Sequence, residues 1–330
     1  MSSQSHLRAG SGAQSTTEAA VRESPARQRR GNQDAQARIR RLTGGTEHVL
    51  GETIEVTPDL LALLAGGDAQ SVESGVDGTG ETDMSTGTAF VHDPGEDKTG
   101  VNADDVTQGQ LANCYFMAAM KAVARANPQA IHDLISENDD GTYDVTLYVK
   151  EHVWSLNASP KVYTVSPTFP TQGGRTLGAE AGDSVGDTRE IWPMLLEKAF
   201  AIHCGSYKET EYGFGGAAMQ LLTGQDTDNV GLLLGLGLRA EATILADLAG
   251  ALTDKKAVTA ATGEFDADTL KAAKAAYPGR LGQKHVYAVK EVDVEGKTIS
   301  LDNPWGGDTD IDHMPVADFK KFFRQYDIVG

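Results

Sequence analysis

The chain contains two cysteines, Cys114 and Cys204, and each is a candidate thiol nucleophile. Cys114 lies where a helical pattern begins, directly after QGQLAN, and a helix N-terminus favours the reactive thiolate form. Cys204 instead lies on the apolar face of a later predicted helix, with no glutamine and no helix start near it, so we interpret it as a core residue. Cys114 is therefore the predicted nucleophile of an acyl-transfer reaction.

A thiol nucleophile also needs a base, a group that orients the base, and donors for the oxyanion that forms on attack. His285 stands at the start of one predicted strand and Asn303 at the end of the next, so a hairpin would bring their side chains together. Gln108 precedes the nucleophile by six residues and could donate its amide N–H to the oxyanion, beside the backbone N–H of Cys114. Taken singly, these residues also have ordinary structural explanations: a core thiol, a structural histidine and an Asn-Pro turn.

The elements that would position these residues follow from hydrophobic periodicity. Helices are predicted over residues 114–126, 191–204, 217–224, 241–251, 267–276 and 316–326, and strands over 142–150, 161–166, 285–294 and 297–305. The last two strands are expected to pair through a turn at Glu295-Gly296. The pattern predicts an α+β protein in which a helix-rich lobe with Cys114 meets a β-rich lobe with His285 and Asn303 at a cleft, the boundary lying near residues 225–240.

Composition excludes some classes of protein. A net charge of -18 argues against nucleic-acid binding, which needs a basic face. The N-terminus lacks the apolar stretch of a secretory signal, and the most apolar run, residues 231–238, is too short to span a bilayer. Two cysteines do not make a disulfide framework, which favours a reducing compartment. We therefore expect a cytoplasmic protein without a membrane span, and export or delivery as an effector remains an alternative.

The first 97 residues have a separate composition. Residues 1–43 hold eight arginines against three acidic residues, whereas residues 44–105 hold fourteen acidic residues against Lys98. So little there could be buried that we predict residues 1–97 to be largely disordered, ahead of a core over 98–330. The segment could bind an inhibitor, a carrier or a secretion assembly, or it could be a solvated linker.

Three segments around these candidates resemble the calpain family of cysteine proteases, a branch of the papain-like superfamily. QGQLANCYFMAA resembles the calpain pattern Q-G-x-L-G-[DN]-C-[WY]-[FL]-x-A-A, KHVYAV resembles G-H-A-Y-x-V, and LDNPWG resembles R-N-P-W-G. Between and after them, REIWPMLLEKAFAIHCGSY, AMQLLTG and HMPVADFKKFFRQYDIV are also similar to calpain segments, so the resemblance runs from about 98 to 330. It implies a papain-like two-lobed fold and cleavage of protein or peptide substrates through a thioester. It also implies that Cys114 is the nucleophile, His285 the base and Asn303 the group that orients the base. Gln108 would donate to the oxyanion, and Trp305 would shield the base.

The sequence departs from that pattern beside two of the implied catalytic residues. Ala112 replaces a glycine ahead of the nucleophile, and Lys284 replaces the glycine before the histidine. Lys284 could lower the basicity of His285 or point to solvent, and we expect it to point to solvent.

Calcium is the cofactor that the resemblance raises, as a regulator, because the chemistry itself needs no cofactor. In the first lobe, Gly100, Asp105 and Glu190 fall at positions that resemble ligands, and oxygen ligands suit Ca²⁺. In the second lobe the acidic insertion of animal calpains is absent, and only Asp308, Asp310 and Asp312 lie nearby. Calcium ligands and ordinary surface or capping carboxylates both remain open interpretations.

Three functions are consistent with the sequence. The first is an endopeptidase, calcium-dependent or not, that cuts protein substrates. The second is an amide-transferring enzyme with the same triad, which the calpain-like segments between the triad residues disfavour. The third is a peptide-binding module that has lost catalysis, which is disfavoured because Cys114, His285, Asn303 and Gln108 are all present.

Overall fold

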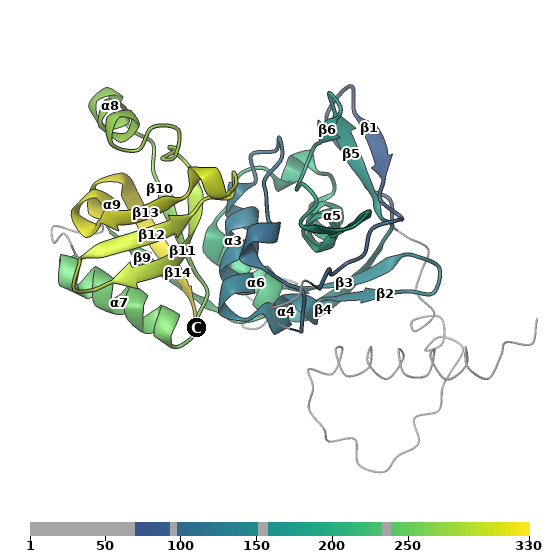
Figure 1. Cartoon of the computed structure of the whole chain (residues 1–330), viewed down its shortest axis with the longest axis horizontal. Coiled ribbons are helices and arrows are strands. Elements are labelled where there is room, and N and C mark those ends of the chain that lie inside the picture. Colours follow the sequence, from purple (N-terminus) through teal and green to yellow (C-terminus); the bar gives the residue numbers. More distant parts are fainter. Residues whose placement is uncertain (1–69, 93–97, 151–157, 233–238) are drawn as a thin grey trace, which may run out of the picture. The chain divides into compact units, whose positions relative to one another are not determined.

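The computed structural model describes residues 70–92, 98–150, 158–232 and 239–330, which belong to one compact unit spanning Ile54–Gly330 (Figure 1). It is a mixed α+β structure. None of the helices described there combines the length and the apolar character that a bilayer-crossing segment requires. The predicted disorder of residues 1–69 and 93–97 lies outside the described residues.

Residues 70–224, called here the first half, combine small antiparallel sheets with helices. The sheets are β2-β3-β4, β1-β5-β6 and the pair β7-β8. In chain order the elements are β1 (Gly80–Asp83), η1 (Ala103–Asp105), α3 (Cys114–Ala126), α4 (Pro128–His132), β2 (Ile135–Glu137), β3 (Tyr143–Val149), β4 (Ser159–Val165), β5 (Thr168–Gln172), β6 (Arg175–Thr176), β7 (Ser184–Val185), β8 (Thr188–Arg189), α5 (Trp192–Cys204), η2 (Lys208–Thr210) and α6 (Gly215–Thr223).

Residues 225–330, called here the second half, form one six-stranded antiparallel sheet in the order β13-β12-β11-β10-β14-β9 (Figure 1). Its elements are β9 (Thr227–Gly231), α7 (Glu241–Thr253), β10 (Val258–Thr262), α8 (Ala267–Ala276), β11 (Val286–Asp293), β12 (Thr298–Asp302), η3 (Gly307–Thr309), β13 (Ile311–Pro315), α9 (Val316–Phe322) and β14 (Phe323–Val329). The predicted pairing of the segments 285–294 and 297–305 is present as β11 with β12.

Helix α3 forms because CYFMAAMKAVARA consists largely of strong helix formers and buries almost every side chain. It ends where Asn127 leaves the helical conformation, with φ -153° and ψ 85°, ahead of Pro128, which begins α4. These boundaries agree with the prediction, so the nucleophile candidate Cys114 is the first residue of the helix.

Strand β11 separates two large clusters of buried side chains. Successive side chains of a strand point to opposite faces, and here Val286 and Ala288 join the cluster of the first half while Tyr287 and Val289 join that of the second. Burial on both faces explains why VYAV is an uninterrupted apolar run. The strand therefore places His285, the residue before it, at the edge of the contact between the two clusters.

Two expectations differ from the structure. Residues 316–326 were predicted to be one helix, but α9 stops at Phe322 and the chain continues as β14, because this segment pairs with β10 on one side and with β9 on the other. Residues 70–92, expected to belong to a largely disordered region, are ordered where they are described. Strand β1 pairs with β5, and Ala89 and Val91 are buried.

Candidate active site

The Cys114 thiol lies at the N-terminus of α3 and is 9% exposed. Burial raises the pKa of the thiol, while the backbone N–H groups of Val286, Tyr115 and Cys114 itself act in the opposite direction. The expectation that the helix start alone would favour a thiolate is therefore incomplete, because desolvation is the larger effect. Cys204, by contrast, is half-buried against the first-half cluster.

His285 is held at the start of β11 by backbone and side-chain hydrogen bonds. Its backbone N–H donates to Thr262 Oγ1 at 3.0 Å, and its Nε2 lies 2.9 Å from Asn303 Oδ1. Because the amide oxygen can only accept, Nε2 carries the proton and Nδ1 of the neutral ring is left as a base. Burial lowers the pKa of His285 to about 4, and the hydrogen bond that His285 donates to Asn303 opposes that shift.

Asn303 is fully buried just after β12, and every polar group of its side chain is engaged. Its Nδ2 donates to the carbonyl oxygens of Arg280 at 3.1 Å and Thr309 at 3.3 Å, which fixes the orientation of the amide. Its Oδ1 also accepts the backbone N–H of Trp305 at 3.2 Å. With its orientation set in this way, the amide presents oxygen to His285.

The Trp305 ring lies over His285, with ring centroids 4.2 Å apart and planes inclined by 33°. His285 is only 4% exposed, whereas Trp305 is 43% exposed. The indole therefore covers the imidazole on its solvent side. Lys284 points away, with its Nζ 3.2 Å from Glu264 Oε2 and its side chain 60% exposed.

These side chains share one cavity of about 480 Å³, which is lined by Gln108, Cys114, His285 and Trp305 among others. Gln108 is held by its backbone N–H, which donates to the Pro304 carbonyl at 2.7 Å. Its Nε2 donates to the Leu111 carbonyl at 2.6 Å, and its Oε1 is buried without a hydrogen-bond partner among the described residues. One of the two Nε2 protons is used there, so the second remains for a ligand in the cavity.

Two functional features of this region were not predicted from the sequence. Glu197 of α5 is buried and accepts from Asn113 Nδ2 at 2.6 Å and from the Ala179 N–H at 2.6 Å, so it braces the residue before Cys114. Burial raises the pKa of Glu197 to about 7. The available signal was a glutamate within the otherwise apolar run PMLLEKAF.

The second unpredicted feature is an aromatic mouth on the cavity. Tyr212 and Phe214 are 78% and 68% exposed and line the cavity on either side of Gly213. A Cβ on Gly213 would lie 2.4 Å from the Tyr115 ring, so only glycine lets the chain pass this close to α3. Two bulky aromatic residues around a glycine, in the segment EYGFGG, were the available sequence signal.

The predicted metal-ligating residues of the first half lie close together. A Cβ placed on Gly182 would be 2.9 Å from Glu190 Oε2 and 3.0 Å from Asp105 Cβ, so the two carboxyl groups flank one glycine. Gly100 packs against the backbone of Val91, whose N–H donates to Glu190 Oε1 at 2.8 Å. Burial raises the pKa of both carboxyl groups. The negative charge of Asp105 adds to the rise for Glu190, whereas hydrogen bonds from the Asn102 N–H, Trp192 and Glu190 oppose the rise for Asp105.

Neither Asp105 nor Glu190 has an ion pair to a cation among the described residues, and a bound metal ion would supply the missing positive charge. Asp105 Oδ2 accepts from Trp192 Nε1 and from the Asn102 N–H, and the carboxyl groups of Asp105 and Glu190 are hydrogen-bonded to each other, so a cation would replace the proton between them. Within the described ranges, no three His, Cys, Asp or Glu side chains cluster in a way that could hold a metal ion. Any further ligands there would have to be backbone carbonyls or water. The residues fit calcium on these terms.

The carboxylates of the second half have a different environment. Lys290 Nζ lies 2.9 Å from Asp310 Oδ2 and 2.9 Å from Asp312 Oδ1. The ammonium already supplies the positive charge between these two acids, and the third, Asp308, is exposed. This arrangement disfavours a calcium site there.

Comparison with known proteins assigns the family. Residues 86–312 match the calpain family of cysteine proteases. The chain is 24% identical over 277 residues to the Calpain-1 catalytic subunit of Homo sapiens, covering 82% of this chain and 36% of that protein. It is 27% identical over 125 residues to Calpain-13 of Rattus norvegicus, covering 38% of this chain and 18% of the relative.

A plant protein is similar as well. Calpain-type cysteine protease DEK1 of Zea mays is 25% identical over 215 residues, which cover 64% of this chain and 9% of that protein. The chain thus spans at most 36% of the length of these three relatives. Since the family match covers more than half of its residues, the chain belongs to the calpain family of cysteine proteases.

Proposed function

We propose that this protein is a cysteine endopeptidase that hydrolyses peptide bonds in protein substrates, with Cys114 as nucleophile, His285 as base and Asn303 as the orienting group. One observation carries the proposal: a thiol at a helix N-terminus shares a cavity with a buried imidazole whose Nε2 lies 2.9 Å from an oriented amide oxygen. The two clusters of buried side chains that meet at β11 support the finer proposal of a papain-like two-lobed core.

The reaction follows from which atoms are free. Nδ1 of His285 takes the thiol proton, and the thiolate attacks the peptide carbonyl carbon. The oxyanion accepts from the Cys114 N–H, which has no partner within the helix, and from the free N–H of Gln108. The imidazolium then gives its proton to the leaving amine, and water hydrolyses the thioester.

Burial shapes the first step. It favours the neutral form of both Cys114 and His285 when each is considered alone. Thiolate and imidazolium therefore form together, because each charge stabilises the other, and the two groups titrate as a pair. Trp305 keeps water from the imidazole and so strengthens that attraction.

The cavity mouth supports extended protein segments as substrates. Three of the four large hydrophobic side chains that are exposed among the described residues, Tyr212, Phe214 and Trp305, line this one cavity. Exposed apolar surface gathered at one place marks a binding site. We propose that apolar side chains of an unfolded or loop segment pack there while the scissile bond lies over Cys114.

We further propose that calcium regulates the enzyme by binding in the first half at Asp105 and Glu190, with the Gly100 carbonyl as an additional ligand. The support is the pair of buried acids without a cation. Bound there, calcium would supply positive charge and bring the chain segments around these residues together. Residues 1–97 remain our candidate for contacting an inhibitor, carrier or secretion assembly.

The test is cleavage of unfolded casein with and without calcium, using wild-type protein, Cys114→Ala and the matched control Cys204→Ala. We expect activity in the wild type and the control, and none in Cys114→Ala. Iodoacetamide should label Cys114 faster than Cys204. Wild-type protein that leaves casein intact in both conditions would refute the protease, and peptide binding without cleavage would favour the inactive module.

A further inference from the structure

A buried cluster of charges joins the helix of Cys114 to the strand that precedes Asn303. Asp302, the last residue of β12, is fully buried, and its Oδ1 lies 3.0 Å from Lys121 Nζ, itself 1% exposed. Arg125 Nη2 contacts the other carboxylate oxygen. Both cations belong to α3, so the cluster crosses from the first half to the second.

The cluster is close to both sides of the proposed active site. Lys121 follows Cys114 by seven residues, about two helical turns, so the two lie on the same side of α3. Asp302 is adjacent to Asn303 in the chain. A shift of α3 relative to β12 would therefore change the position of the thiol relative to the imidazole and would also break the ion pairs.

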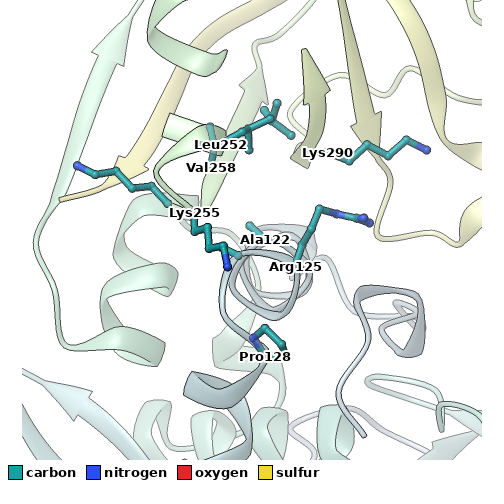
Figure 2. A pocket seen from close by; sticks show the side chains of 10 residues that line it. Ala122, Arg125, Pro128, Leu252, Lys255, Val258 and Lys290 are labelled. Carbon is teal, nitrogen blue, oxygen red and sulfur yellow. The ribbon is translucent and has the colours of Figure 1, made fainter. Parts of the chain in front are cut away.

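The Asn303 backbone is held from the other side by a second acid. Its N–H donates to Asp310 Oδ1 at 2.8 Å, and Asp310 is paired with Lys290. Figure 2 shows Arg125 and Lys290 along one cavity of about 240 Å³, Arg125 rising from α3 on the side where Lys290 leaves its strand. Both cations already have carboxylate partners, and Lys255 and Lys256 also line this cavity.

Stability alone does not account for a cluster of this kind. Removing charges from water costs about as much as their attraction returns, and apolar replacements are often equally stable. Buried polar groups can instead select one register between packed elements, because any other register leaves a charge unpaired. Here the alternatives would leave Lys121 without its carboxylate in a site closed to water.

We infer that Asp302 is a positioning residue of the proposed protease: its ion pairs with Lys121 and Arg125 fix the position of α3 relative to β12, and so the position of Cys114 relative to His285. This inference rests on the proposed function. It assigns a role in catalysis to residues that touch neither substrate nor the reacting atoms.

The test compares Asp302→Asn with the double variant Lys121→Met/Asp302→Asn, which leaves no unpaired buried ammonium. Asp302→Asn is expected to lower both the unfolding temperature and kcat, the latter by about 10- to 100-fold, because small misplacements of reacting groups have effects of that size. The double variant should recover much of the unfolding temperature but not kcat. KM should stay within about twofold in both, since the aromatic mouth is unchanged.

A second readout does not depend on peptide cleavage. The rate at which iodoacetamide alkylates Cys114, followed against pH, reports the thiolate–imidazolium pair. We expect the double variant to lose the neutral-pH reactivity of the wild type and to react only as pH approaches the range of an isolated thiol. Arg125→Gln, which removes the more exposed cation, should give an intermediate loss of about 2- to 5-fold.

The matched control is Lys198→Met, which removes a buried cation that hydrogen-bonds only within the first half. It should lower the unfolding temperature and leave kcat and the alkylation profile unchanged. A double variant with wild-type kcat and alkylation profile would overturn the inference. Failure of the wild type to cleave any peptide would instead refute the proposed function, while the alkylation comparison would still decide the inference.

Discussion

The acids beside the Cys114 helix and the acids beside Asn303 are neutralised in different ways. Asp105 and Glu190 in the first half are buried, and no ion pair to a cation is found for either among the described residues. Asp302 and Asp310 in the second half are each paired with a lysine. The first set is held by hydrogen bonds and shared protons, and the second by permanent charges of the chain itself.

The difference indicates where an outside cation could act. A buried acid without a cation can be stabilised by a proton or by a metal ion, so its state depends on pH and calcium. An acid paired with lysine has its counter-charge at any pH near neutrality. The calcium response proposed above is therefore expected from the first half, and the second half should hold Asn303 in place without it.

The largest expected effect is the pH dependence contributed by His285, whose sign is opposite to that of the first-half acids. Its folded pKa of about 4 lies below the ordinary 6.5, so the unfolded chain binds more protons between these values. The free energy of unfolding therefore keeps the full contribution of His285 above pH 6.5 and falls by roughly 3 kcal/mol as the pH drops towards 4. Denaturant unfolding of wild type and His285→Gln across this window measures it; parallel curves would contradict the prediction.

The next largest effect is expected for Lys290→Met, which removes the cation paired with Asp310 and Asp312. Asp310 is 13% exposed and burial already raises its pKa, so without Lys290 the carboxyl group that holds the Asn303 N–H would have no cation beside it. We expect the free energy of unfolding to fall by about 2 kcal/mol and activity to fall with it. Asp312→Asn, at a position 57% exposed, is the control and should change stability by less than about 0.5 kcal/mol. Equal losses in both variants would contradict the prediction.

A smaller effect of opposite direction is expected for Glu190→Gln. Because the folded pKa of Glu190 is raised above the ordinary 4.5, its stabilising contribution is present at low pH and is lost as pH rises. The neutral amide of the variant side chain does not titrate, so the variant does not lose stability as pH rises, and it keeps an acceptor for the Val91 N–H. We therefore expect Glu190→Gln to be more stable than wild type by about 1–2 kcal/mol at pH 8 and similar to it near pH 4.5.

The same variant tests calcium. Calcium should raise the unfolding temperature of the wild type, more strongly at higher pH because the ion competes with protons, and it should leave Glu190→Gln almost unchanged. A calcium shift of the same size in both proteins would remove Glu190 from the proposed site.

The smallest expected effect is that of Lys284→Ala. Its ion pair with Glu264 is exposed on both sides, 60% and 75%, so stability should change by less than about 0.5 kcal/mol. Activity on casein should stay within about twofold. A large drop in kcat would show that Lys284 acts on His285 after all.

Local signals were enough for the parts of the site that lie within single elements. The helix at Cys114 and the hairpin that brings His285 beside Asn303 could be predicted because strong helix formers, strand alternation and the turn residues Glu295-Gly296 act over short stretches. The last strand could not, because residues 323–326 continue the helix-like pattern of the preceding residues and belong to β14 only through pairing with β10 and β9. Tertiary pairing overrides propensity there.

By itself, the sequence determined the nucleophile candidate, its partners and the family, because these depend on residue types within short segments. Only the tertiary structure decided which charges are buried and what each one meets. Lys121 and Asp302 are 181 positions apart in the chain, as their numbers show, yet lie 3.0 Å apart. Burial also reversed the expected direction of the thiol pKa, since desolvation depends on what surrounds a group and not on its neighbours in the chain.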